Sequence, residues 1–207
     1  MRGFVQAGLD LRTDLREMSR QRYVCLPQTL PMDGEFALDS VGDIHIESIR
    51  QWRNAQMDVL RQEAPITQVA QQRYFETRIW PTLETPQPDN VLLVLLHQGR
   101  AIGYGGLVHI AWAHRRAEVS FLLAPELTLE EDTYARYFSC YLGLIKRLAF
   151  ESLGMRRLFT ETYAGRVHHM GVLESAGFRV EGRLREHVLI AGVPVDSVFH
   201  GILRNEG

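Results

Sequence analysis

Three segments in the second half of the chain decide the fold: residues 116–123 read RAEVSFLL, residues 141–154 read YLGLIKRLAFESLG, and residues 157–163 read RLFTETY. The first and third have the length and composition of strands, and apolar residues recur at helical spacing in the second. Gly154 follows the last apolar helix position and is the expected C-terminal stop. A helix that joins two strands of one sheet forms a right-handed crossover, so we predict that these strands are parallel.

Outside this unit the chain alternates strand-like and helix-like segments. Val91–His97 and Ala101–Ile110 are predicted strands, joined by a tight hairpin turn at Gln98 and Gly99. Further predictions are a strand at Glu35–Val41, helices at residues 43–54 (with Asp43 as N-cap), Thr67–Ile79 and His168–Ser175, and a final strand pair within Val188–Leu203. The sequence therefore predicts an α/β domain with a mixed sheet flanked by helices.

A chain of 207 residues is close to the size of one domain. Turn residues cluster at Leu30–Gly34, before the first periodic segment. We therefore predict an N-terminal arm at residues 1–34 and one domain at residues 35–207.

Composition excludes several classes of function. The formal net charge of -2 leaves no basic field for nucleic acid, and the two cysteines, Cys25 and Cys140, form no CxxC motif. The longest apolar run, Val91–Leu96, is far shorter than the roughly 20 residues of a membrane span. Charged residues interrupt Met1–Arg20, so no signal peptide is indicated and we expect a cytoplasmic protein.

Five separated segments, in the same order, resemble the GNAT superfamily of acyl-CoA-dependent N-acyltransferases. They are residues 117–126 (AEVSFLLAPE), 149–158 (AFESLGMRRL), 172–178 (VLESAGF), 181–187 (EGRLREH) and 196–201 (DSVFHG). The likeness covers roughly residues 35–203 and is greatest to the branch of ribosomal-protein N-terminal acetyltransferases and bacterial amino-sugar N-acetyltransferases. The segment IRQWRN at residues 49–54 favours the amino-sugar side.

The resemblance implies a centrally splayed sheet with acetyl-CoA as cosubstrate. The pantetheine arm would lie between the strands Glu118–Leu123 and Arg157–Tyr163, along Phe121, Leu122 and Leu123. Where these strands separate, their backbone groups are free to pair with the pantetheine amides. An ordinary buried strand pair is the alternative.

One segment departs from the family pattern. Where the family opens its long helix with a glycine-containing turn that binds the CoA pyrophosphate, this chain has Thr133–Phe138 without glycine. Thr128–Glu131 before it has the pattern of a capping box, with acidic side chains. Arg136 can replace part of the anion site or can be an ordinary exposed arginine, and Arg166 stands where the family has an asparagine that contacts pantetheine.

Two residues are candidates for the catalytic base. Glu118 is a carboxylate in an apolar strand, on the same side as Ser120, and can act as the base or form a surface salt bridge to Arg115 or Arg116. His169 can accept a proton or contact the cofactor, or it can be a surface or capping histidine next to His168. Adjacent helical histidines diverge and no cysteine lies nearby, so we expect no metal site.

Acceptor recognition is expected opposite CoA. The candidates are Trp52, Arg53, Trp80, Arg185 and His187, because tryptophan can stack on a base or sugar and arginine can bind a diphosphate. Both tryptophans can equally be core residues. The glycines of Gly103–Gly106 belong to a strand pattern and indicate close backbone packing or a bulge rather than a phosphate loop.

The expected function is therefore N-acetylation of a small amine, a nucleotide-linked amino-deoxy sugar for surface glycan synthesis. The alternatives are acetylation of a peptide N-terminus or another small amine, or a non-catalytic GNAT-like binding module. The sequence is compatible with a homodimer but does not determine the oligomeric state.

Overall fold

One sheet organises the protein, whose structure is a computed structural model that describes residues 22–206. Within this range eight strands follow the order β1-β2-β3-β4-β5-β6-β8-β7. Their bounds are β1 Met32–Asp33, β2 Phe36–Ser40, β3 Val91–His97, β4 Arg100–Ala111, β5 Arg116–Leu123, β6 Arg157–Tyr163, β7 Arg179–Ile190 and β8 Val193–Leu203. Among these strands only β5 and β6 pair in parallel, which confirms the predicted crossover and the mixed sheet.

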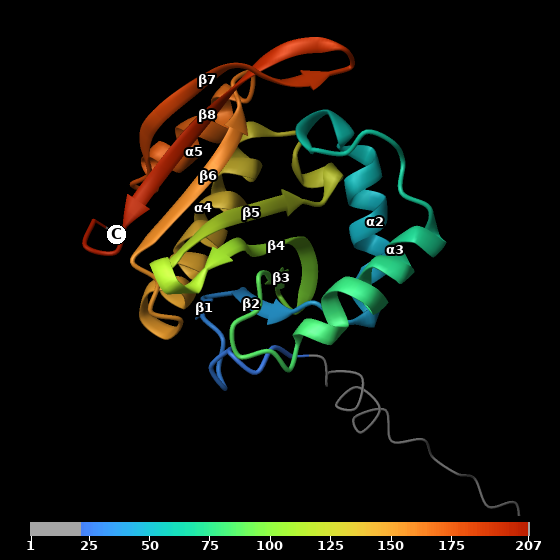
Figure 1. Cartoon of the computed structure of the whole chain (residues 1–207), viewed down its shortest axis with the longest axis vertical. Coiled ribbons are helices and arrows are strands. Elements are labelled where there is room, and N and C mark those ends of the chain that lie inside the picture. Colours follow the sequence, from blue (N-terminus) through green and yellow to red (C-terminus); the bar gives the residue numbers. More distant parts are fainter. Residues whose placement is uncertain (1–21, 207) are drawn as a thin grey trace, which may run out of the picture.

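Four helices accompany the described sheet: α2 Ile46–Ala55, α3 Gln68–Tyr74, α4 Glu131–Arg147 and α5 Val167–Ser175. α4 and α5 pack together behind the sheet, whereas α2 and α3 lie together at the side toward which β5 runs (Figure 1). Short π-helical turns at Phe75–Ile79 and Leu148–Ser152 extend α3 and α4. The long helix predicted from the apolar pattern that starts at Tyr141 is therefore confirmed as α4. It begins ten residues earlier, at Glu131.

Local sequence explains several element boundaries. Gln98 and Gly99 both have positive φ, 51° and 77°, which is the requirement of a two-residue hairpin turn. The hydroxyl of Thr67 accepts the Ala70 N–H at 3.2 Å and caps α3. The predicted N-cap at Asp43 is wrong, because a 3-10 turn begins there and Gly42 occupies the cap position, its N–H donating to His45 Nδ1 at 3.0 Å.

The boundary predicted after Gly34 does not coincide with a break in packing. Tyr23 is 1% exposed and Leu26 is 8% exposed, both within the main core. The Leu92 N–H donates to the Tyr23 hydroxyl at 3.2 Å, which fixes this segment to the sheet. Residues 22–34 therefore belong to the domain, and residues 1–21 of the predicted arm lie outside the described residues.

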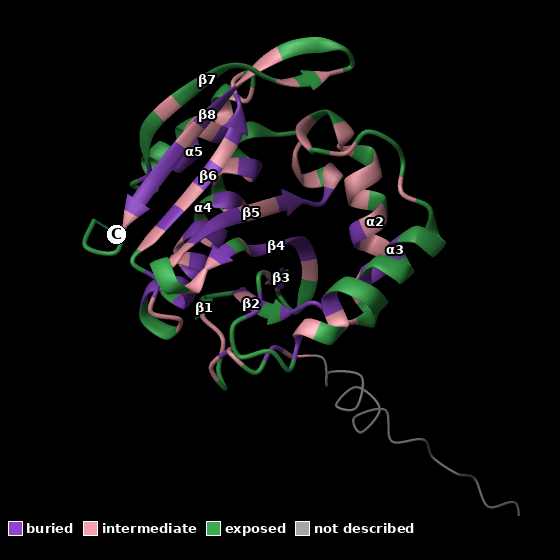
Figure 2. Cartoon of the chain, viewed as in Figure 1, coloured by how far each residue is buried: buried purple, intermediate pink, exposed green. Residues whose placement is uncertain are grey.

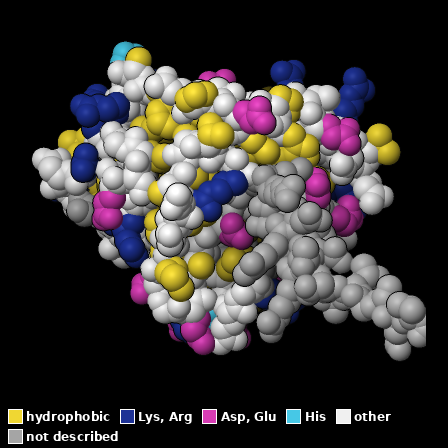
Figure 3. All heavy atoms as spheres, turned by 90° about the horizontal axis from the view of Figure 1, so that it is seen from below, with side chains coloured by type: hydrophobic (Ala, Val, Ile, Leu, Met, Phe, Trp, Pro, Cys, Tyr) yellow, Lys and Arg dark blue, Asp and Glu magenta, His cyan; other side chains and the backbone are white. Residues whose placement is uncertain are grey.

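Burial divides the sheet unevenly. β3, β4 and β5 are largely buried, whereas β7 is exposed along most of its length (Figure 2). The face seen from below carries acidic and basic side chains interspersed with apolar ones, as a formal net charge of -2 suggests (Figure 3). No helix of the described part of the chain is long and apolar enough to cross a membrane.

Candidate active site

The candidate site lies where two neighbouring strands part. β5 and β6 pair through only three residue pairs, the last of which joins Glu118 to Phe159. Beyond this point the strands diverge around a cavity of about 210 Å³, which we call the splay cavity. Its walls include Val119, Ser120 and Phe121 of β5, Thr160, Glu161, Thr162 and Tyr163 of β6, Phe138 of α4 and His169 of α5. The predicted splayed strands are thus present.

Backbone groups of β5 face this cavity. The Ser120 carbonyl accepts the Tyr141 hydroxyl at 2.7 Å, and the Ala124 N–H donates to Ile102 of β4 at 2.8 Å. Because backbone groups alternate along a strand, Val119 and Phe121 turn their N–H and C=O groups toward β6. The strand separation therefore presents peptide groups to a ligand.

Side chains of β6 add further polar groups to the same cavity. The hydroxyl oxygens of Thr160 and Thr162 are buried and have no hydrogen-bond partner among the described residues. A buried hydroxyl without a partner is costly, so a polar ligand that reached either hydroxyl from the cavity would satisfy it. These groups fit the amide-bearing pantetheine arm that the family resemblance implies.

Glu118 lies at the closed end of the splay cavity and is 9% exposed. His109 Nδ1 lies 2.7 Å from one of its carboxylate oxygens, and Arg61 donates to the other at 3.4 Å. The predicted alternative, a salt bridge from Glu118 to Arg115 or Arg116, is wrong, because the carboxylate has these other two partners. His109 is 62% exposed at its side chain and connects Glu118 to solvent.

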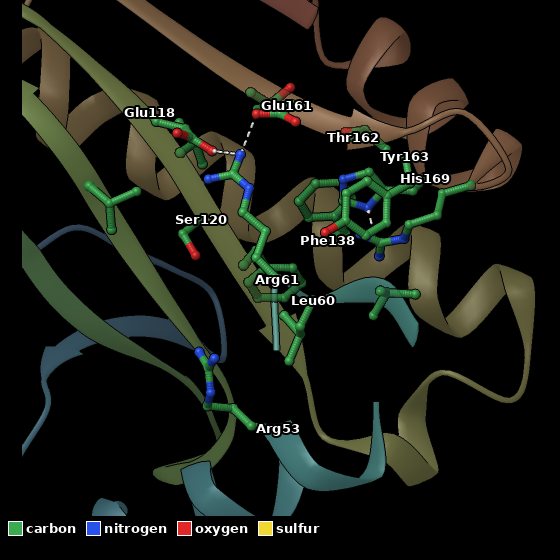
Figure 4. Close-up of a pocket in the computed structure, with 16 residues that line it drawn as sticks. Arg53, Leu60, Arg61, Glu118, Ser120, Phe138, Glu161, Thr162, Tyr163 and His169 are labelled. Atoms are coloured by element: carbon green, nitrogen blue, oxygen red, sulfur yellow. Dashed lines mark hydrogen bonds and ion pairs between the residues drawn. The ribbon is translucent and has the colours of Figure 1, made fainter. Parts of the chain in front are cut away.

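Arg61 joins two carboxylates from opposite sides of the splay. It comes from the loop between α2 and α3, and its guanidinium pairs with both Glu118 and Glu161 (Figure 4). Glu161 also accepts the Ser197 hydroxyl at 2.8 Å and lies 3.7 Å from His187 Nε2. A cation is therefore already held between these two acidic groups.

His169 occupies the other end of the cavity, away from Glu118 (Figure 4). The Tyr134 hydroxyl lies 2.6 Å from its Nδ1, and the ring stacks on Phe138 at 4.4 Å between centroids. Burial first, and then the charge of Arg166, lowers the pKa of His169 well below its ordinary value. The imidazole is therefore neutral, and the hydrogen-bond network assigns its proton to Nε2, because Tyr134 donates to Nδ1.

Arg166 lies beside this pair. Its guanidinium donates to the Tyr134 hydroxyl at 3.3 Å and lines the splay cavity. Burial raises the pKa of Tyr134, with Arg166 opposing that change, so the phenol remains protonated near neutral pH. Arg166 is thus a cation next to the first turns of α4, at the end of the cavity opposite Glu118.

The predicted cofactor residues are only partly brought together. Phe121 lines the splay cavity, whereas Leu122 and Leu123 are core residues of the same strand, 4% and 1% exposed. Arg136 lies over the rings of Phe36 and Tyr137, with its Cζ atom 5.8 Å from each centroid. This contact places Arg136 toward β2 and outside the splay cavity lining.

The predicted capping box before α4 is wrong. Thr128 uses its hydroxyl to bond the Pro125 carbonyl at 2.8 Å, and Glu130 is the N-cap without a capping side-chain hydrogen bond. The first turn of α4 nevertheless carries Glu131 and Asp132, so its acidic character is as predicted. Of the two arginines predicted to contact the cofactor, Arg166 lines the splay cavity near the start of α4, whereas Arg136 does not line it.

The five predicted acceptor residues are scattered. Arg53 lines the splay cavity, and His187 approaches Glu161, but Arg185 lies exposed on β7 near Asp196. Trp52 lines a separate hollow with residues such as Leu96 and Pro125, and Trp80 packs behind Phe75 at 5.0 Å between ring centroids. The two tryptophans therefore pack against the core, which was the alternative prediction, and they form no joint stacking platform with Arg53.

Sequence reasoning missed Arg61, His109, Glu161 and Tyr134. Glu161 carries the same signal as Glu118, a carboxylate within a predicted strand of the splayed pair, and could have been found by it. His109 meets Glu118 only because a bulge shifts the register of β4 against β5 between Val108 and Ala111. Arg61 lies in a loop, and no local pattern marks it.

Comparisons with known proteins agree with this geometry. Residues 42–199 match the profile of a family described as an acetyltransferase (GNAT) domain. A search of curated proteins finds no significant match.

Solved structures share the fold at low sequence identity. Spermidine N-acetyltransferase from Vibrio cholerae, solved with CoA and spermine, superposes with a TM-score of 0.71 at 19% identity, over 84% of this chain and 98% of that one. A structure described as glutamate-to-glutamine mutant forms of the spermidine/spermine N-acetyltransferase from Vibrio cholerae gives a TM-score of 0.69 at 18% identity, over 84% and 96% of the two chains.

Proposed function

Because this chain belongs to the GNAT acetyltransferase family, we propose that it acetylates the primary amine of a small molecule, with Glu118 as the base. Acetyl-CoA is the cosubstrate of this acyl-CoA-dependent N-acetyltransferase. The observation that carries the proposal is a buried carboxylate, Glu118, at the point where β5 and β6 part, connected to solvent through His109.

The proposed reaction balances with groups of this chain. Acetyl-CoA supplies a thioester carbonyl carbon, to which the amine nitrogen forms a new C–N bond while the C–S bond breaks. An acceptor that binds as an ammonium ion loses two protons, one before the nitrogen attacks and one as the amide forms. Glu118 accepts each in turn and can pass it to His109, whose exposed ring exchanges protons with solvent, and solvent returns one proton to the group that protonates the thiolate. The products are the N-acetylated amine and CoA with a free thiol.

Tyr163 is suited to protonate the departing thiolate. It lines the splay cavity, and burial raises the pKa of its phenol, so that it stays protonated at neutral pH. The N–H groups of Val119 and Phe121 face the same cavity and are the donors available for negative charge on the carbonyl oxygen. In this proposal Glu118 accepts protons from the amine, and Tyr163 donates a proton to the thiolate.

Arg61 indicates where the amine binds. Its guanidinium occupies the space between Glu118 and Glu161, which is a position suited to a cation. A protonated amine entering the cavity would compete with Arg61 for these carboxylates and would meet Glu118 directly. We therefore place the amine of the acceptor between Glu118 and Glu161.

The far end of the splay cavity is proposed to hold the cofactor. Val119, Phe121, Thr160 and Thr162 would pair with pantetheine amides, and Arg166 is the cation suited to a phosphate near α4. His169 is proposed to support Arg166 and Tyr134 rather than to act as a base, because its Nδ1 is already hydrogen-bonded and lies away from Glu118.

A nucleotide-linked amino sugar is a less suitable acceptor. It would need an aromatic stacking platform for its base, and neither of the two predicted tryptophans, Trp52 and Trp80, lines the splay cavity. We therefore propose a small primary amine without a nucleotide. The family membership likewise favours an enzyme over the non-catalytic binding module.

Glu118→Gln tests the proposal. We expect kcat for a primary amine, measured by release of the CoA thiol, to fall by on the order of 10²–10⁴, because the variant cannot accept a proton. The acetyl-CoA dissociation constant, measured by calorimetric titration, should stay within about twofold.

Glu126→Gln is the matched control, since Glu126 is an exposed carboxylate outside the splay cavity lining. It should leave kcat and acetyl-CoA affinity unchanged. A loss of kcat below about tenfold in Glu118→Gln would exclude Glu118 as the base. Failure of the unmodified protein to bind acetyl-CoA would exclude the transferase activity itself.

A further inference from the structure

A second cavity opens beside the splay cavity, between α2, α3 and the sheet. Its volume is about 390 Å³, and we call it the side pocket. Most of its lining is apolar or aromatic: Ile49, Ile66, Tyr74, Phe75, Leu92 and Tyr104. Tyr74 is 46% exposed, so the pocket borders the protein surface on the α3 side.

The side pocket is continuous with the proposed site of acetyl transfer. Arg53, Val108 and Ser120 line both cavities. Ser120 and Glu118 are two positions apart on β5 and lie on the same side of the strand. Two residues of a strand span roughly 7 Å. A molecule whose body lies in the side pocket can therefore place its amine next to Glu118.

Charges are distributed unequally between the two cavities. Both carboxylates, Glu118 and Glu161, line the splay cavity, whereas no Asp or Glu of the described chain lines the side pocket. The charged group of the side pocket is Arg53, which donates to the Tyr104 hydroxyl at 2.8 Å and to Gln62 at 3.1 Å. One end of the combined cavity is thus suited to a cation, and the other end to an uncharged apolar group.

We propose that the acceptor is a primary monoamine with an aromatic or branched apolar body. The body fills the side pocket against Tyr74, Phe75 and Tyr104, and the single amine lies between Glu118 and Glu161. This inference rests on the proposed function and specifies its substrate class.

Charge argues against a polyamine as the preferred acceptor. A polyamine bound through one amine would place a second ammonium group in the side pocket, next to Arg53 and without a carboxylate partner. Burying an unpaired charge beside one of like sign is strongly unfavourable. A monoamine with an apolar body avoids this cost and also removes its apolar surface from water.

A substrate panel tests the proposal with the full chain and acetyl-CoA, by release of the CoA thiol. The acceptors are 2-phenylethylamine, ethylamine, spermidine and UDP-glucosamine. We expect kcat/KM for 2-phenylethylamine to exceed that for each of the others by about tenfold or more, because filling an apolar pocket discriminates on the order of 10–200-fold per methylene.

Ala70→Phe tests the place of the apolar body. Ala70 is an exposed residue of α3 that lines the side pocket, so a phenyl group there narrows the pocket without entering the core. We expect the ratio of kcat/KM for 2-phenylethylamine to that for ethylamine to fall by about tenfold. Val69→Phe is the matched control, because Val69 is 78% exposed on the same helix and outside the pocket lining.

The outcomes separate the two proposals. If acetyl-CoA binds but no amine of the panel releases CoA, the proposed function is overturned. If ethylamine or spermidine is acetylated as efficiently as 2-phenylethylamine, the proposed function stands and the substrate class is wrong. If UDP-glucosamine is acetylated as efficiently, the proposal of an acceptor without a nucleotide is wrong as well. If Ala70→Phe and Val69→Phe change the ratio equally, the side pocket does not hold the body of the acceptor.

Discussion

At the scale of single residues, His109 has a conformation that its contact with Glu118 explains. Its φ of 48° lies in the left-handed region, which a non-glycine residue adopts at a cost. The residue lies at the bulge where β4 shifts register against β5, and its Nδ1 is 2.7 Å from the Glu118 carboxylate. The bulge therefore aims an exposed imidazole at a buried acid.

His109→Gly is expected to lower kcat by about tenfold or more, because Glu118 loses its proton route to solvent while glycine tolerates the backbone conformation. Added imidazole should restore part of the lost kcat by taking the place of the missing ring. The measurement is thiol release at saturating acceptor, with and without imidazole.

His114→Gly serves as a control, because His114 is an exposed histidine in the turn after β4, outside the splay cavity lining. Imidazole should not change the rate of this variant or of the unmodified protein. A His109→Gly enzyme that is slow but unaffected by imidazole would assign His109 a purely structural role.

At the scale of elements, the close approach of β4 to its neighbours depends on glycine. A Cβ on Gly105 would overlap the Ser120 carbonyl oxygen and lie 2.8 Å from the Tyr141 hydroxyl. That hydroxyl accepts the Gly106 N–H at 2.6 Å and donates to the Ser120 carbonyl, so one buried tyrosine of α4 joins β4 and β5. Burial raises the pKa of Tyr141, which keeps this hydroxyl protonated.

Gly105→Ala is expected to lower the free energy of unfolding by about 1–3 kcal/mol, because the added methyl group must push apart backbone atoms and the tyrosine hydroxyl. Urea unfolding followed by circular dichroism measures the change.

Gly143→Ala is the comparison, since a Cβ at this position of α4 meets nothing within 4 Å. It should raise stability by about 0.5–1 kcal/mol, as alanine loses less backbone entropy in a helix. Equal effects of the two substitutions would contradict the close approach at Gly105.

At the scale of the whole molecule, buried histidines make stability depend on pH. Burial lowers the pKa of both His169 and His45 below the ordinary value. In the unfolded chain each ring binds a proton below about pH 6.5, whereas in the folded protein it stays neutral to lower pH. The unfolded state then binds more protons, so stability falls as pH falls through this window.

We expect the free energy of unfolding to decrease between pH 7.5 and pH 5.5, with His169 contributing on the order of 1 kcal/mol. His169→Asn should flatten this pH dependence, whatever its effect on stability at pH 7.5. Urea unfolding at several pH values gives the slope.

His168→Asn provides the matched control, because its ring is 38% exposed and lies next to His169 on α5. It should change the slope far less than His169→Asn does, because the charge of His168 is the last of the contributions that lower the pKa of His169. A slope that is identical in the unmodified protein and His169→Asn would show that His169 is not the buried neutral group inferred here.

The sequence by itself determined the order of the central elements and the parallel pair among them, whereas β1 and the first part of β7, before Val188, were not predicted. Period-two and helical patterns are local, and the crossover rule converts them into topology, so β5, α4 and β6 could be predicted from residues 116–163. Glu118 could be found in the same way, since a carboxylate in an apolar strand is unusual wherever that strand lies. The glycines of β4 were likewise correctly read as close packing.

Only the tertiary structure decided which side chains surround Glu118 and where the acceptor can lie. Arg61 is 57 residues from Glu118 in sequence, and Tyr104 is 51 residues from Arg53, so no local pattern relates these pairs. Tryptophan was misleading because a large amphipathic ring suits a core and a ligand site equally, and Trp52 and Trp80 pack against the core. Side-chain neighbours depend on how loops and register shifts place distant segments, and those placements follow from packing of the whole chain.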